Sequence, residues 1–393
     1  MNNYWTQEDA KSILDSIDKW VETRLRPIAK EFDQEDKYPH ELVDEMKDLG
    51  LFGATISPNY GGLGLPASIY AKIVSKVASV WMAPGGIFNS HLIQASAIER
   101  CGSERQKERF LPRMVSGEMR GGIALTEPNA GTDLQAIKTK AVKSEDGKNY
   151  IINGTKTWIT NALNGNSLAV LVKTDSSIEP RYRGCSLLLV ETKDENGELK
   201  PGISINKLKK LGYRAIDTCE VNFDNFPVPV ENLIGEKEGH GFTQALGGLE
   251  LGRINVAARG AGIAQGALML ALRYAQERET FGKPICKHQA IQLKLGEMAT
   301  KVEASQLLIE QAAAKYDAGE RCDMEAGMAK YFATEAGVYC AEEAMRIFGG
   351  YSYSTEFDIE RFYRDAMLMC IGEGTNEMQR IIIAKQLVEK HSQ

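Results

Sequence analysis

Apolar residues in the first third of the chain recur at spacings of three and four residues. The clearest positions are Ile13, Ile17, Trp20, Val21, Leu42, Val43, Met46 and Leu49. Such spacing places apolar side chains on one face of an α-helix. Glycine and proline clusters at residues 58–66 and 84–86 interrupt the pattern. We therefore expect an N-terminal helical domain over residues 1–120.

The pattern changes to short β-type runs in the middle of the chain. These runs cover residues 150–152, 168–172, 186–190, 203–205 and 219–223. The turn signals that separate them are Asp146-Gly147, Asn153-Gly154, Asn196-Gly197 and Pro201-Gly202. Because glycine tolerates the positive φ of tight turns, the pattern favours an antiparallel sheet or barrel over residues 121–236.

Helical spacing returns after Gly239, in longer segments. The positions of one stripe are Ile291, Leu295, Met298, Val302, Ile309 and Ala312, with only the polar Ser305 breaking it. We interpret this stripe as the core seam of a helix packed against other helices. It predicts a C-terminal four-helix bundle over residues 237–393, so the fold class is α+β in the order helical, β, helical.

Composition and charge exclude several classes of protein. Of 393 residues, 43% are hydrophobic and 25% charged, which is typical of a globular chain with several domains. Since no apolar run approaches the roughly 20 residues of a bilayer span, and the N-terminus lacks an export signal, we expect no membrane segment. A net charge of -6 without a long basic block disfavours nucleic acid as a partner. The expected compartment is the cytoplasm, or the mitochondrial matrix for a mature chain.

Cysteine and histidine usage gives no sign of a metal or a disulfide framework. The seven cysteines are scattered without a C-x-x-C pair, which favours reduced thiols. The five histidines are equally dispersed, so we expect no metal site.

A turn rich in hydroxyl and backbone donors joins the first helical segment to the β segment. It runs from Ala124 to Asp133 and includes Leu125, Thr126 and Thr132. Such a turn suits hydrogen bonding to a flat polar heterocycle and a thioester chain, although alone it is compatible with an ordinary loop.

This turn closely resembles the first signature of the FAD-dependent acyl-CoA dehydrogenase family. Four further stretches match the family in order and spacing, at residues 153–161, 278–282, 347–350 and 372–377. The resemblance covers essentially the whole chain. It implies an oxidoreductase acting on CH–CH bonds, which converts an acyl-CoA thioester to a trans-2-enoyl-CoA and passes a hydride to flavin N5.

The resemblance also implies which residues hold FAD. The flavin would lie between the β segment and the C-terminal helices, with Leu125 and Thr126 on its pyrimidine side and Trp158 and Thr160 flanking the ring. Without the motif, Trp158 would be interpreted as a buried core aromatic.

A second group of cofactor residues lies in the C-terminal segment. The resemblance implies that Arg278 and Phe281 reach the FAD of a neighbouring subunit, and hence a homo-oligomer, expected to be a tetramer; the alternative for Arg278 is a solvated charge at a helix end. The remaining positions are Arg346, Gly349, Gly350, Thr375 and Glu377. Arg346 and Ser352 depart from the family pattern, which has Gln and Gly there, so the contact made by Arg346 is open.

Glu373 matches the family's catalytic base. Removing a proton next to a thioester carbonyl needs a carboxylate in a water-poor pocket, and Glu373 follows an apolar run and stands between Gly372 and Gly374. The alternative is an exposed loop glutamate. Some relatives place the base on a helix at the position of Gly252, and a glycine there favours Glu373.

Substrate contacts are implied at fewer positions. Thr132 resembles the hydroxyl near the pantetheine arm, and Glu250 and Arg253 resemble contacts to CoA; charged pairs on helices are also often solvated surface groups. Gly252 and Gly372 remove bulk beside the α-carbon, which favours a short branched or cyclic acyl group. Ile87 and Phe88 would line that cavity or belong to the core.

Three competing functions remain at this point. A flavin oxidase or oxygenase of the same fold would be reoxidised by oxygen instead of by an electron-transfer flavoprotein, the expected acceptor. A non-catalytic nucleic-acid-binding flavoprotein is disfavoured by the charge of -6. A purely structural helical protein would not bind FAD.

Overall fold

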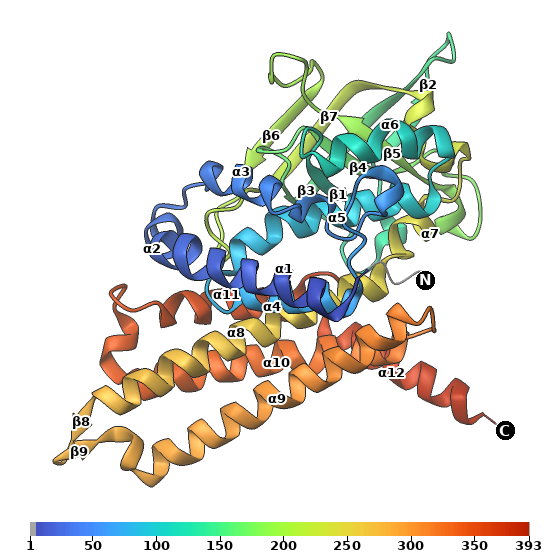
Figure 1. Cartoon of the computed structure of the whole chain (residues 1–393). Helices are drawn as coiled ribbons and strands as arrows, with labels where there is room; N and C mark the ends of the chain where they lie inside the picture. The colour runs from blue at the N-terminus through green and yellow to red at the C-terminus, as the bar shows by residue number, and fades with distance from the viewer. Residues whose placement is uncertain (1–4, 393) are drawn as a thin grey trace.

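The computed structural model describes residues 5–392, and its first part is helical (Figure 1). The helices are α1 (Gln7–Trp20), α2 (Arg26–Glu35), α3 (His40–Asp48), α4 (Ala67–Ala78), α5 (Met82–Cys101) and α6 (Glu104–Val115). A π-helical turn, Val21–Leu25, joins α1 to α2. The side chains of Thr6 and Ser103 cap α1 and α6 and receive backbone N–H groups that would otherwise lack partners.

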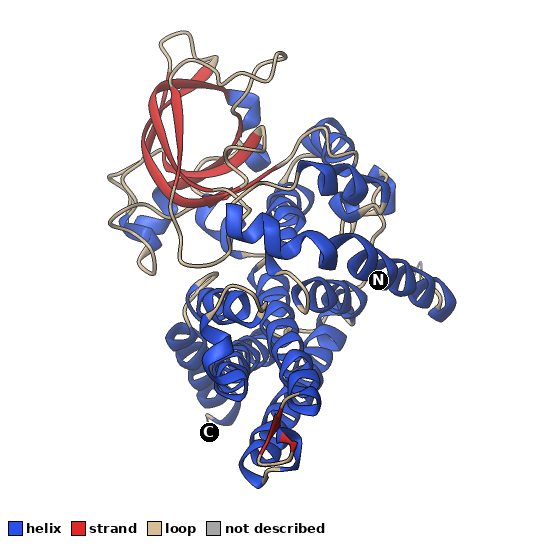
Figure 2. Ribbon diagram, turned by 90° about the vertical axis from the view of Figure 1, so that its left-hand side faces the viewer, coloured by secondary structure: helices blue, strands red, loops and turns tan. Residues whose placement is uncertain are grey.

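The middle part is a seven-stranded sheet with the strand order β1-β4-β2-β3-β7-β6, with β5 paired to β4. The strands are β1 (Gly121–Ala124), β2 (Lys140–Lys143), β3 (Asn149–Thr160), β4 (Ser167–Lys173), β5 (Cys185–Glu191), β6 (Ile203–Lys207) and β7 (Thr218–Pro229). Figure 2 shows these strands curling around a common centre. Buried apolar side chains of the strands form a separate core cluster there. The predicted β segment is therefore present as a curled sheet.

Two details of the sheet differ from the sequence prediction. β1 and β2 run parallel to β4, so the sheet is mixed and not purely antiparallel. Asn153-Gly154 is not a turn, because it lies inside β3 at a shift of register. Gly154 has φ +145°, and a β-carbon there would lie 2.6 Å from the Thr139 hydroxyl oxygen, so this glycine permits a close approach of two chains.

The last part is a helical bundle. Its helices are α7 (Gly241–Leu246), α8 (Leu249–Glu277), α9 (Gln289–Asp317), α10 (Asp323–Phe348), α11 (Ile359–Ile371) and α12 (Asn376–His391). A small hairpin of β8 (Glu279–Thr280) and β9 (Lys283–Pro284) joins α8 to α9 at the far end of the bundle from the sheet (Figures 1 and 2). Among the described residues, no helix has the length and apolar character of a membrane span.

The predicted seam on α9 is only partly buried. Met298, Val302, Ile309 and Ala312 are buried, whereas Ile291 and Leu295 are half-buried at the end next to the hairpin. Ser305, the polar residue of this stripe, is also fully buried. Its burial is tolerated because its hydroxyl donates to the Lys301 carbonyl one turn earlier, 2.7 Å away.

Close glycine contacts fix the position of α8. A β-carbon at Gly262 would lie 2.3 Å from the Ser75 carbonyl oxygen of α4, and one at Gly260 would lie 2.8 Å from the Ala333 carbonyl oxygen of α10. Helix α8 therefore packs backbone against backbone on two sides. This contact also joins the N-terminal helices to the bundle in one core.

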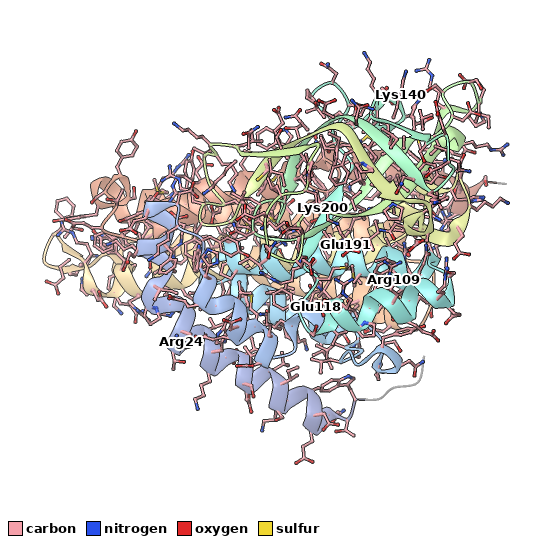
Figure 3. The ribbon with its side chains drawn as sticks, turned by 90° about the horizontal axis from the view of Figure 1, so that it is seen from above. Arg24, Arg109, Glu118, Lys140, Glu191 and Lys200 are labelled. Atoms are coloured by element: carbon pink, nitrogen blue, oxygen red, sulfur yellow. The ribbon has the colours of Figure 1, made fainter. Side chains whose placement is uncertain are left out.

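Ion pairs join α6 to neighbouring segments, one of which is strand β5. Arg109 pairs with Glu231 at 2.9 Å, and Arg113 pairs with Glu118 at 2.7 Å and Glu191 at 3.4 Å. Arg109, Glu118 and Glu191 are labelled in Figure 3, which views the molecule from above. These pairs are partly exposed, so each contributes little to stability, on the order of 0 to 1 kcal/mol.

Candidate active site

Glu373 lies in the short connection between α11 and α12. The Gly372 N–H ends α11 by donating to the Leu368 carbonyl, 2.8 Å away. Glu373 then has φ +55° and Gly374 has φ +89°. A glutamate rarely adopts a left-handed backbone, so the connection holds this residue in a costly conformation that is typical of functional sites.

Helix α10 anchors both sides of this connection. The buried Lys330 ammonium donates to the Cys370 carbonyl at 3.2 Å and to Asn376 Oδ1 at 2.9 Å. Thr334 and Asn376 are hydrogen bonded to each other at 3.0 Å. Burial lowers the pKa of Lys330 to about 8. Thr375 caps α12 by accepting the Met378 N–H, so it has a structural role beside its expected cofactor role.

The Glu373 carboxylate faces α8. Its Oε1 lies 2.6 Å from Nη2 of Arg259, with 29% of the Glu373 side chain and 5% of the Arg259 side chain exposed. Burial lowers the pKa of the Arg259 guanidinium, but the nearby carboxylate outweighs burial and the pKa is raised. A β-carbon at Gly252 would lie 3.1 Å from Oε2 of Glu373, so the structure brings these two predicted positions together.

Sequence reasoning missed three buried polar side chains around this carboxylate. They are Arg259, Asn255 and Tyr213. Burial raises the pKa of Tyr213 to about 12, and both Arg259 and Glu373 act on it electrostatically. A signal was available for Arg259, because it is the only charged residue in the run 254–264, which otherwise contains Ile, Val, Ala, Gly and one Asn.

The middle domain presents the first group of predicted cofactor residues. The Leu125 carbonyl accepts from the Lys156 ammonium at 3.0 Å, and the Thr126 carbonyl accepts from a backbone N–H of β3 at 2.9 Å. Trp158 has φ +63° at a shift of register in β3 and is 60% exposed. It is therefore not the buried core aromatic of the alternative interpretation. Thr160 ends the same strand and is half-buried.

A hydrogen bond connects this group to the helices. The residue after Thr160, Asn161, donates its amide to the Ile87 carbonyl on α5 at 2.7 Å. Ile87 and Phe88 are both buried, and Gly86 allows the Tyr213 hydroxyl to approach, because a β-carbon there would lie 1.5 Å from it. Trp158 and Thr160 thus lie on the strand that reaches the centre of the molecule.

Most of the second group of cofactor residues lies at the far end of the bundle, whereas Thr375 and Glu377 stand beside Glu373 at the start of α12. Phe281 is 98% exposed on the hairpin, with φ +51°. The Arg278 guanidinium lies 5.8 Å from the centre of the Tyr351 ring. Added β-carbons at Gly349 and Gly350 would meet nothing within 4 Å. Figures 1 and 2 place the hairpin far from the sheet, so one chain does not bring the two groups together.

Arg346 is explained by its own helix. It forms ion pairs with Glu342 and, at 3.1 Å, with Glu343. Ser352, the other departure from the family pattern, donates its hydroxyl to the Gly349 carbonyl at 2.8 Å. The acidic neighbours already neutralise Arg346, whereas the serine closes the glycine turn.

The positions predicted to contact CoA are less distinctive. Arg253 is buried and lies 3.5 Å from Asp323, and Glu250 accepts the Cys322 N–H at 3.3 Å. Both residues therefore hold the start of α10. Thr132 is exposed in the turn before β2.

The remaining predicted positions have local structural partners. Glu377 is exposed and pairs with Arg380 at 2.9 Å. A β-carbon at Gly372 would lie 3.3 Å from the Leu368 carbonyl oxygen.

These surfaces fit FAD. Trp158 and Phe281 offer exposed aromatic rings, the turn from Leu125 offers the hydroxyl groups of Thr126 and Thr132, and the backbone at glycines 349 and 350 faces open space. Flat heterocycles bind to aromatic faces, while hydroxyl groups and uncovered glycine backbone suit close contact with the polar parts of a dinucleotide. Within residues 5–392, no three His, Cys, Asp or Glu side chains converge as metal ligands would, and all seven cysteines are unpaired.

Comparison with known proteins identifies the family. Residues 7–118, 122–226 and 239–388 match the acyl-CoA dehydrogenase N-terminal, middle and C-terminal domains. The chain is 38% identical to a 3-(aryl)acrylate reductase of Clostridium sporogenes, covering 94% of this chain and 96% of the relative. It is 35% identical to a cyclohexane-1-carbonyl-CoA dehydrogenase of Syntrophus aciditrophicus, covering 98% of each.

A solved structure gives the same result for the fold. The butyryl-CoA dehydrogenase of Megasphaera elsdenii is 36% identical, with a TM-score of 0.91 over 99% of this chain and 100% of that chain. The helical, curled-sheet and helical parts described above are therefore those of a known architecture. The chain belongs to the acyl-CoA dehydrogenase family of flavoprotein oxidoreductases.

Proposed function

We propose that this chain catalyses α,β-dehydrogenation of an acyl-CoA thioester to a trans-2-enoyl-CoA, with Glu373 as the base. The main support is the Glu373 carboxylate, which a left-handed backbone holds opposite the side-chain-free Gly252 on α8. Gly252 offers no competing base, and Glu373 is only 29% exposed. A partly buried carboxylate opposite an open position suits proton removal from a bound ligand.

In this mechanism the Glu373 carboxylate takes the α-proton while the β C–H bond breaks and a carbon–carbon double bond forms. When bound, FAD supplies the two-electron acceptor for the hydride that leaves the β-carbon. The Glu373 N–H donates to no acceptor among the described residues, so it is available to the thioester oxygen. Removing such a donor typically costs about 3 kcal/mol of barrier.

We assign FAD binding to both predicted groups. Leu125, Thr126, Trp158 and Thr160 would hold it from one chain. The residues of a neighbouring chain would be Arg278, Phe281, Gly349 and Gly350, with Thr375 and Glu377 near the base. We leave Arg346 out, because Glu342 and Glu343 already neutralise it. This division between chains makes a homo-oligomer necessary, and a tetramer is proposed.

The proposed substrate has a short branched or cyclic acyl group. Gly252 and Gly372 leave room beside Glu373, and a relative named for cyclohexane-1-carbonyl-CoA is similar over almost the whole chain.

An electron-transfer flavoprotein is the proposed acceptor of the electrons from reduced FAD. The cytoplasm or the mitochondrial matrix is the proposed compartment, as relatives are known from bacteria and from mitochondria.

The reverse reaction is a second candidate. Two relatives at 38% identity are named as reductases, of 3-(aryl)acrylate and of acryloyl-CoA with NADH. The same carboxylate would then return a proton to the α-carbon. Anaerobic incubation of the reduced protein with an enoyl-CoA distinguishes the two directions by the rate at which flavin absorbance returns.

The test of the proposal is an anaerobic titration of the FAD-loaded protein with a panel of acyl-CoAs. The measured signal is the loss of flavin absorbance. Glu373→Gln should keep FAD and bind acyl-CoA, yet bleach roughly a thousandfold more slowly, because no carboxylate takes the proton. Glu389→Gln on the exposed end of α12 is the matched control. Near-normal bleaching by Glu373→Gln would falsify the assignment, and fast reoxidation by air would favour the oxidase alternative.

A further inference from the structure

The face of α8 opposite Glu373 carries unpaired polar atoms. Gly252, Asn255 and Arg259 follow one another at spacings of three and four, so they share one face of the helix. Asn255 is 2% exposed and Arg259 is 4% exposed. Asn255 Nδ2, Asn255 Oδ1 and Arg259 Nε are buried without a hydrogen-bond partner among the described residues.

These atoms are costly to leave unpaired. A buried donor or acceptor without a partner costs about 1 to 3 kcal/mol, so a native protein keeps several together only for a reason. The Tyr70 hydroxyl lies beside Asn255 but donates to Asn89 Oδ1 at 3.2 Å. Asn255 lies close enough to oppose the rise in the pKa of Tyr70, but neither of its amide atoms makes a hydrogen bond of full geometry among the described residues.

Another buried arginine shows what a purely structural role looks like. Arg361 is 3% exposed, and its guanidinium donates to Asp358 at 3.0 Å and to the Val80 carbonyl at 3.0 Å. The Arg361 guanidinium has no orphaned nitrogen. Arg259, by contrast, donates only to Glu373 among the described residues, and Glu373 is the group that the proposed reaction requires to be free.

We infer that the acyl group of the substrate carries a carboxylate, which the Arg259 guanidinium and the Asn255 amide bind. This inference rests on the proposed function. A guanidinium presents a planar fork of donors that matches a carboxylate, and the Asn255 amide adds a further donor one turn away. An alkyl chain would leave the Asn255 amide and Arg259 Nε without a partner among the described residues.

The distance to the base limits the length of such a substrate. Because Arg259 Nη2 lies 2.6 Å from the Glu373 carboxylate, the second carboxylate must lie only a few bonds beyond the α-carbon. Monothioesters of short saturated diacids, of the succinyl or glutaryl type, have this shape. They retain the short acyl group already proposed and add a charged end.

A contact between the substrate carboxylate and Arg259 would also free Glu373 from its ion pair. Arg259 is paired with Glu373, and the pair must open before the carboxylate can take a proton. A substrate carboxylate that takes the place of Glu373 on the guanidinium keeps the buried cation paired. A neutral acyl group offers no such exchange and leaves the pair closed.

Matched pairs of thioesters test this inference on the FAD-loaded protein. Glutaryl-CoA is compared with pentanoyl-CoA and succinyl-CoA with butyryl-CoA, by calorimetric binding and by anaerobic bleaching. We expect the carboxylated member to bind and react about 10- to 100-fold better, as for a hydrogen bond to a charged group. Equal or better reaction of the neutral members would overturn the inference while the proposed function stands. Bleaching by none of the four would also overturn the inference, and the proposed function would then be decided separately by the branched and cyclic acyl-CoAs of the first titration.

Variants of Arg259 sharpen the test. Arg259→Gln should lose the preference for the carboxylated member in both affinity and bleaching, and Arg259→Lys should keep part of it, because the charge remains but the fork is lost. Arg181→Gln, at an exposed position, is the control. An unchanged preference in a folded Arg259→Gln would overturn the inference; if that variant does not fold, the wild-type thioester pairs decide.

Discussion

Asp365 on α11 is a fully buried carboxyl group next to the active-site residue Tyr213. It accepts the Tyr213 N–H at 2.6 Å. Burial, reinforced by the neighbouring Asp33, raises its pKa to about 7, against smaller opposing effects of this hydrogen bond and of Arg364 and Arg361. Asp365 therefore changes from a neutral carboxyl group to a carboxylate near neutral pH, next to Tyr213.

The shift predicts a pH dependence of stability. The folded protein holds the Asp365 proton more tightly than the unfolded chain, in which the pKa is near 3.8. The group thus contributes stability at acidic pH that is lost as the pH rises through about 7. We expect Asp365→Asn to gain on the order of 2 kcal/mol relative to wild type between about pH 5 and 8, measured by urea unfolding. Asp15→Asn at an exposed position should show no such gain, and parallel curves for wild type and Asp365→Asn would contradict the prediction.

At the residue scale, the sequence predicted the positions of the motifs but not their partners. The sequence analysis named Gly252 and Glu373 as alternative positions of the base, and a β-carbon added at Gly252 would lie 3.1 Å from Oε2 of Glu373. Arg259 was missed because its partner lies 114 residues away in the sequence. A charge on a helix is usually solvated, and only the fold shows that this one is buried.

At the scale of elements, the base depends on how three helices meet. Lys330 on α10 holds the last turn of α11 and the first residue of α12, so it fixes both ends of the connection that carries Glu373. The connection is only a few residues long and has two successive positive φ values. Its geometry is therefore set by its ends.

Removing this anchor should affect both stability and rate. In Lys330→Met, the Cys370 carbonyl and the Asn376 side chain lose a donor, which should cost about 1 to 3 kcal/mol of stability in urea unfolding. Bleaching should slow roughly 10- to 100-fold with FAD content unchanged, because the base is misplaced. Lys72→Met, in an exposed ion pair on α4, is the control. Normal bleaching by Lys330→Met would show that the connection holds its shape without α10.

The elements themselves were largely predictable. Helical spacing and turn signals are local, so all three parts of the chain could be recognised in order from the sequence. The parallel pairing of β1 with β4 could not, because it joins strands separated by more than forty residues and depends on their packing. Asn153-Gly154 was mistaken for a turn because the glycine has an unusual φ for a different reason, the close approach to Thr139.

At the scale of the whole molecule, two aromatic residues expected to hold the cofactor lie far apart in one chain. Trp158 belongs to the sheet and Phe281 to the hairpin beyond the bundle (Figure 2). The Phe281 ring is 98% exposed and, among the described residues, has only an edge contact with the His288 ring. Its expected contribution is therefore to a neighbouring copy, which the sequence of one chain suggests only through family resemblance.

Phe281→Ala tests this arrangement. We expect the variant to lose FAD during gel filtration and to dissociate at higher protein concentration than wild type. The unfolding of the isolated chain should change by less than about 0.5 kcal/mol, as for other exposed positions. Val142→Ala, which removes an exposed side chain from the sheet, should retain FAD. Full cofactor retention by Phe281→Ala would contradict a role for the hairpin in holding FAD.

The backbone contacts of α8 at Gly260 and Gly262 begin directly after Arg259. Gly262 stands three residues after Arg259 and seven after Asn255, so it lies on the same side of the helix as these polar side chains, and its close approach to Ser75 of α4 fixes where they stand. Exchanges at 252, 255 and 259 that keep both glycines therefore change the side chains beside Glu373 on a helix whose axis α4 and α10 hold in place. A small combinatorial library at those three sites is the economical way to redirect the enzyme to new thioesters.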